Sequence, residues 1–113
     1  GQHVEQVVVA LQSAHADMQL AAFALAAGDA DTALALTGRG LPLAAEAENA
    51  ALLASLLMVR AEALDLTGRQ SEAAVVRLDS LGWARYGFGS DDEVRARLVN
   101  IAALSPVNRA RPE

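Results

Sequence analysis

The feature that most constrains this chain is a stripe of mainly apolar side chains close to its start. Its members recur alternately four and three positions apart: Val4, Val8, Leu11, His15, Met18, Ala22 and Leu25. This spacing places all of them on one face of an α-helix. We therefore expect a long helix over residues 3–27, ending at Gly28 because glycine adopts the left-handed cap conformation at little cost.

A second helix is expected directly after this glycine. Asp29 and Asp31 sit where acidic side chains cap free N–H groups and favour the positive end of the helix dipole. Gly38 and Gly40 follow soon afterwards. Because glycine lowers helix propensity, the second helix is predicted to be short.

Three further helices complete the predicted fold. Pro42 is expected to open the third, over 43–67, because proline suits a first helical position. Its leucines and alanines cover most of its circumference, which is typical of a central helix. The fourth is expected over 70–81 and is followed by a Gly-rich segment, 82–89.

The fifth helix is predicted to start at a capping box formed by Ser90 and Glu93 and to end near Leu104. Residues 1–105 then form a single domain, and residues 106–113, which include two prolines, form a tail or linker.

Composition supports an all-α fold and excludes several functions. The hydrophobic fraction is 53% but the aromatic fraction is only 4%, so Ala and Leu dominate, and both favour helix. The net charge of −5 repels phosphate, which argues against nucleic acid and anionic membranes as partners. Every basic residue is Arg, which together with the Ala content indicates a GC-rich bacterial source.

The chain offers little for metal or redox chemistry. It has no cysteine, which excludes disulfides and zinc–thiolate sites. We expect no cofactor and no bound metal. The longest apolar run, residues 50–59, is too short to span a bilayer, and no signal peptide precedes it. Both the cytoplasm and the periplasm remain open as the compartment.

An internal repeat appears when the sequence is aligned with itself so that Gly28 falls on Gly68. Further positions then carry identical residues, at Ala14 and Ala54, Met18 and Met58, Ala21 and Ala61, Ala33 and Ala73, and Leu41 and Leu81. A fixed offset of this kind predicts two stacked helical hairpins, each with a long and a short helix, and a fifth helix that caps them.

The segments 21–33 and 61–73 resemble the tetratricopeptide repeat, with its small close-packing residue, helix-ending Gly and second-helix Ala. The resemblance implies a scaffold whose concave face is lined by the first helix of each hairpin. Family members that clamp a peptide carboxylate use Lys, Arg and Asn on this face, and this face has none of the three. The face would therefore suit an apolar or weakly basic protein segment. Carried over residue by residue, this face carries His15 and Ser55 together with six predicted contact residues: Met18, Ala22, Leu25, Met58, Glu62 and Asp65.

A second candidate site is the Gly-rich segment, which holds three of the four aromatic residues. Trp83, Tyr86 and Phe88 could fold back as a lid over the hairpins, since aromatic side chains dominate burial in cores. Alternatively, with Arg85 between them, they could form a recognition patch, since Trp, Tyr and Arg are enriched at binding hot spots.

Three functions are compatible with these features. The favoured one is a non-catalytic protein-interaction or scaffold domain that binds a peptide segment or a neighbouring domain. The second is a homodimer formed through the long first helix. The third is a phosphotransfer or enzymatic module using His15. The interpretation that competes with this third function is a partly buried structural histidine. No nucleotide-binding or hydrolase motif is present, so we expect the chain not to be an enzyme.

Overall fold

The structure is a computed structural model that describes residues 1–89 and 91–104. Within them it contains five α-helices and no strand, as the sequence predicted. The helices are α1 (Gln2–Ala26), α2 (Ala30–Glu46), α3 (Ala50–Leu66), α4 (Gln70–Tyr86) and α5 (Asp91–Leu104).

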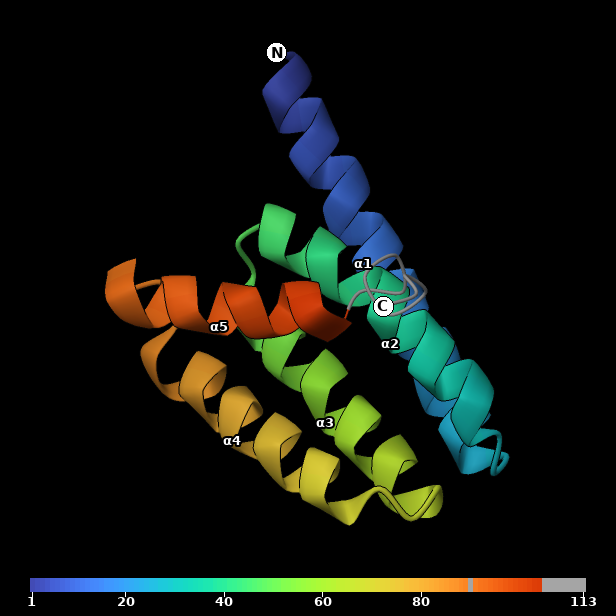
Figure 1. Cartoon of the computed structure of the whole chain (residues 1–113). Coiled ribbons are helices and arrows are strands. Elements are labelled where there is room, and N and C mark those ends of the chain that lie inside the picture. Colours follow the sequence, from blue (N-terminus) through green and yellow to red (C-terminus); the bar gives the residue numbers. More distant parts are fainter. Residues whose placement is uncertain (90, 105–113) are drawn as a thin grey trace, which may run out of the picture.

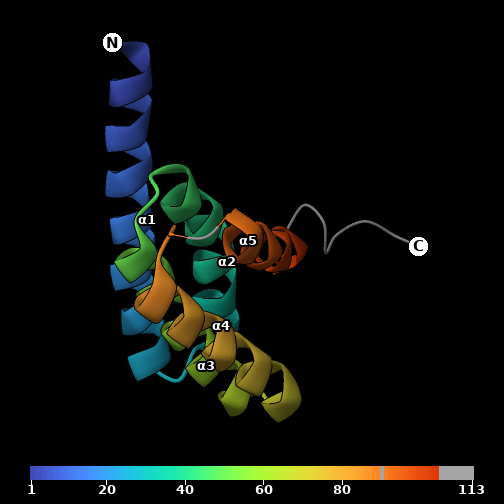
Figure 2. The same cartoon turned by 90° about the vertical axis from the view of Figure 1, so that its left-hand side faces the viewer.

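The helices form two antiparallel hairpins that stack on each other (Figure 1). α1 pairs with α2, α3 pairs with α4, and the hairpins meet where α2 packs against α3, with α1 also touching α3. α5 crosses the stack on the side of α2 that faces away from α1 (Figure 2). α3 is therefore the central helix, as predicted, and its leucines supply much of the core, including Leu53, Leu56 and Leu57.

The connections between the first four helices are short turns with the same backbone geometry. Gly28, Glu48 and Gly68 have φ angles of 79°, 53° and 79°, and they follow one another at equal intervals along the sequence. The predicted helix ends at Gly28 and Gly68 are thus confirmed. The predicted cap at Asp29 is also confirmed, since its carboxylate accepts hydrogen bonds from the N–H and the hydroxyl of Thr32.

The prediction of a short second helix is wrong, because α2 continues through Gly38, Gly40 and Pro42. Both glycines are buried. A Cβ on Gly40 would lie 3.1 Å from the Cβ of Asp17 and 3.2 Å from Leu56 Cδ2. Close packing against α1 and α3 thus explains Gly40 better than helix termination does.

The predicted start of the third helix is also wrong. Pro42 lies inside α2, and α3 begins only at Ala50. Asn49 caps the start of α3, since its side-chain oxygen accepts a hydrogen bond from the N–H of Leu52 at 3.0 Å. The first hairpin joins a longer helix to a shorter one, as predicted, since α1 has 25 residues and α2 has 17. In the second hairpin α3 and α4 both have 17 residues.

The C-terminal part of the fold also departs from the prediction. α4 does not stop at residue 81 but includes residues 82–86, which had been assigned to a Gly-rich loop. Trp83 faces the core from this last part of α4. The predicted end of the fifth helix at Leu104 is confirmed. Ser90 and the predicted tail, 106–113, lie outside the described residues.

The turn residue Glu48 leads to a prediction about stability. It is the single non-glycine residue with positive φ in the described part of the chain. A left-handed conformation costs an L-residue about 1–2 kcal/mol. We expect Glu48→Gly to raise the free energy of unfolding by about 0.5–1 kcal/mol, because glycine's extra freedom in the unfolded chain offsets part of the gain.

Urea unfolding monitored by circular dichroism would measure this change. The matched variant is Gly28→Ala, which places a Cβ at the equivalent turn position and is expected to lower stability by about 1 kcal/mol. A loss of stability in Glu48→Gly would contradict the interpretation that Glu48 is strained.

Candidate partner-binding groove

An open groove of about 630 Å³ lies between α1 and α3. It exists because the stacking of α2 on α3 brings the first helix of each hairpin alongside the other. Its lining is mostly apolar and consists of Ala22, Leu25 and Ala26 from α1 and Val59, Glu62, Asp65 and Leu66 from α3.

Helical periodicity explains why these side chains share the groove. Ala22, Leu25 and Ala26 are three and four positions apart on α1, and therefore lie on one face of that helix. On α3, Val59 and Leu66 flank Glu62 at the same kind of spacing. The two alanines leave space that larger residues on α1 would fill.

An ion pair moderates the charge of the groove. Arg77, from α4, donates a charge-assisted hydrogen bond to the carboxylate of Asp65. This bond raises the pKa of Arg77, with smaller favourable contributions from the charges of Asp65 and Glu62. Glu62 is exposed and forms no ion pair with any described residue. The groove therefore presents one available carboxylate and one that is largely neutralised.

The structure brings together four of the six predicted face residues, since Ala22, Leu25, Glu62 and Asp65 all line the groove. Met18 lies on an adjoining hollow of about 580 Å³ along α1, whose other members are Gln19, Ala22, Phe23 and Ala26. Met58 is exposed on α3, about one turn before Glu62.

The aromatic segment forms a lid only in part. Trp83 is completely buried, and its ring centroid lies 4.8 Å from that of Phe88. The guanidinium of Arg97, from α5, lies 4.6 Å above the Trp83 ring and also donates a hydrogen bond to the Gly87 carbonyl at 3.0 Å. These contacts attach α5 to the end of α4.

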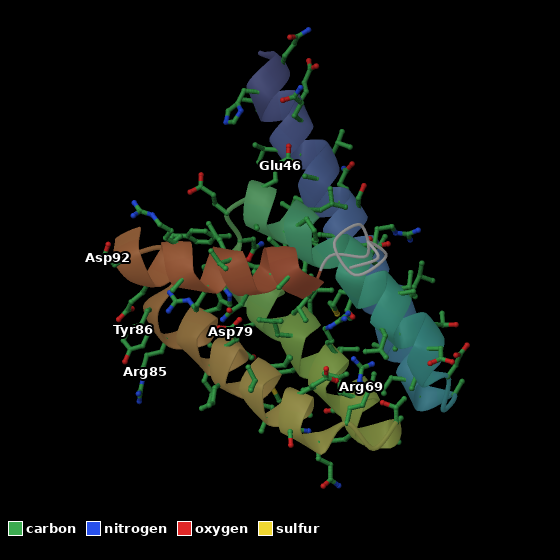
Figure 3. The ribbon with its side chains drawn as sticks, in the orientation of Figure 1. Glu46, Arg69, Asp79, Arg85, Tyr86 and Asp92 are labelled. Atoms are coloured by element: carbon green, nitrogen blue, oxygen red, sulfur yellow. The ribbon has the colours of Figure 1, made fainter. Side chains whose placement is uncertain are left out.

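The prediction that Trp83 contacts a partner is therefore wrong, since burial in the core removes its ring from the surface. Phe88 is partly buried against the same core, so its role is also mainly structural. Arg85 and Tyr86 are both exposed and project from the C-terminal end of α4 (Figure 3). They remain predicted contact residues.

His15 is exposed, so the interpretation of a partly buried histidine is wrong. The buried residues of α1 are Ala10, Ala14, Asp17 and Ala21, which lie on a face next to the predicted stripe. Small side chains on this face allow α2 to pack closely, whereas the larger stripe residues flank the contact. Among the described residues, no group of three or more His, Asp or Glu side chains could hold a metal ion.

Sequence reasoning missed Val59 and Leu66 in the groove and Phe23 beside it. Val59 and Leu66 could have been found from their spacing to Glu62, which places all three on one face of a helix. Phe23 gave no such signal, because its exposure follows from the arrangement of the helices and not from its neighbours in sequence.

No family model, no curated protein and no solved structure matches this chain. The described helices include none that is long and apolar enough to cross a membrane. Fold and groove together define an all-helical domain of two stacked hairpins with an open surface between the first helices.

Proposed function

We propose that this chain is a non-catalytic interaction domain that binds an apolar, weakly basic segment of another protein in the α1–α3 groove. The observation that supports the proposal most directly is the composition of the groove, where five apolar residues surround two carboxylates. The resemblance to tetratricopeptide hairpins points to the same helix pair as a binding surface. The bacterial source and the absence of catalysis remain predictions.

The expected ligand chemistry follows from the side chains. Apolar residues of the segment would gain by leaving water, at about 25 cal/mol per Å² of buried apolar surface. A Lys or Arg of the segment would approach Glu62, because Asp65 is already engaged by Arg77. We therefore expect one basic residue beside two or three apolar ones, and no requirement for a strongly basic sequence.

Selection from a displayed library of random peptides tests the proposal. The unmodified chain should enrich peptides of this composition. Ala22→Trp should reduce the affinity for these peptides at least about tenfold, because the indole would fill the groove. Ala103→Trp is the matched control, since it makes the same change at an exposed position on α5. Equal binding by Ala22→Trp and the unmodified chain would refute the groove as the binding site.

Charge reversal at Glu62 tests the role assigned to the acidic group. Selection with Glu62→Arg should favour acidic residues in place of basic ones, while the apolar positions persist. If the selected sequences keep their basic residue, Glu62 does not contact the bound segment.

A further inference from the structure

The stacked hairpins leave an apolar face exposed on α1 and another on α4, the first and last helices of the stack. On α1, Leu20 and Phe23 are 52% and 76% exposed. On α4, Leu78 and Leu81 are 70% and 64% exposed, and Val75 is exposed beside them. Each set recurs at helical spacing, so each forms a continuous strip along its helix.

These two faces have internal counterparts on α2 and α3, the helices through which the two hairpins pack on each other. The repeat alignment that superposes Gly28 on Gly68 also places Leu78 and Leu81 of α4 on Gly38 and Leu41 of α2. The same alignment places Leu20 and Phe23 of α1 on Arg60 and Ala63 of α3. All four counterparts are buried in the structure.

Contacts of Arg60 and Ala63 show how α3 packs against α2. The guanidinium of Arg60 donates hydrogen bonds to the Leu34 carbonyl at 2.8 Å and to the Thr37 hydroxyl at 3.0 Å. Ala63 packs in one small cluster with Ala33 and Leu34. The second helix of one hairpin thus already binds the first helix of the next within this chain.

We propose that copies of this chain associate head to tail, with α4 of one copy packed on α1 of the next. The contact continues the internal α2–α3 interface, and both of its surfaces are present on every copy. Because the two surfaces differ, the contact is heterologous and leaves a free face at each end of the assembly. It is distinct from the α1–α3 groove and does not depend on the proposed function.

The residues at the exposed faces suit association through apolar contact. Leu20 stands in place of Arg60, Phe23 in place of Ala63, and Leu78 in place of Gly38. Leu20 is apolar where Arg60 is charged, and Phe23 and Leu78 are larger than Ala63 and Gly38. The helices of neighbouring copies would therefore lie farther apart than α2 and α3 do, with hydrophobic burial replacing the buried hydrogen bonds.

α5 does not cover either face. Its contacts with α4 are made through other residues, since Asn100 donates a hydrogen bond to Asp79 and Arg97 packs against Gly82 and Trp83. Leu78 and Leu81 remain exposed although α5 is in place.

Sedimentation velocity over a hundredfold range of protein concentration tests the proposal. The unmodified chain should reach a weight-average mass above that of a dimer. Phe23→Glu and Leu78→Glu should each remain monomeric, because each introduces a charge into one side of the contact. An equimolar mixture of the two variants should form a dimer and nothing larger, since it retains one intact face of each kind.

Val99→Glu is the control, because it places the same charge at an exposed apolar position on α5 and should associate like the unmodified chain. Circular dichroism would verify that all variants keep their helix content. A monomeric unmodified chain would overturn the proposal, and so would a mixture of the two variants that stays monomeric. If only Phe23→Glu prevents association, the contact is instead a symmetric pairing of α1 with itself.

Discussion

Replacing Trp83 by Ala is expected to lower the free energy of unfolding by about 3–5 kcal/mol, the usual cost of truncating a buried Trp. The Trp83 side chain is fully buried and joins three parts of the fold. It packs in the main core, contacts Phe88 in the segment after α4, and lies beneath the Arg97 guanidinium from α5. Its loss would leave a cavity and would also remove the ring that packs between Phe88 and the Arg97 guanidinium.

Urea unfolding provides the measurement, with Tyr86→Ala as the control because this ring is exposed at the same end of α4. Tyr86→Ala should cost less than about 1 kcal/mol. Trp83→Phe should also cost less than Trp83→Ala, since the indole N–H forms no hydrogen bond with a described residue. Similar losses for Trp83→Ala and Tyr86→Ala would disprove the structural role of Trp83.

The second large effect is expected at Leu57, in the middle of α3. Leu57 is fully buried in the core that the two hairpins and α5 share. Leu57→Ala is expected to destabilise the domain by about 2–5 kcal/mol through lost apolar burial and the cavity that remains.

Leu66→Ala is the matched control, because it makes the same change on the same helix at an exposed position in the groove. It should alter stability by less than about 1 kcal/mol. It should nevertheless weaken binding of a groove-selected peptide. The pair therefore separates core packing from partner binding, and equal destabilisation by the two variants would contradict the placement of α3.

Sequence patterns predicted the existence and order of the helices, because apolar periodicity, Gly28, Gly68 and Asp29 act locally. The patterns failed where a residue serves a contact between helices. Gly40 reads as a helix breaker, yet it lies inside α2 because Asp17 and Leu56 leave no room for a side chain. Gly82 likewise lies within α4, beside the Arg97 side chain.

The groove was predicted only in part, because its lining depends on how the helices pack against one another. The tetratricopeptide resemblance assigned Ala22 and Glu62 to one face formed by the first helices of the two hairpins, and both residues line the groove. The resemblance did not predict which face of α1 is buried. That face contains the small residues Ala14 and Ala21. Burial of Trp83 was one of two alternatives that the sequence left open, because the choice between them depends on where α5 crosses the stack.

The short turns between helices also determine how the chain reaches its fold. They make α1 and α2, α2 and α3, and α3 and α4 neighbours both in sequence and in space, so most contacts join segments close together along the chain. Low contact order of this kind is associated with folding in microseconds to milliseconds. Each hairpin can nucleate by itself, and the docking of α5 across α2 closes the longest loop and is therefore expected to come last.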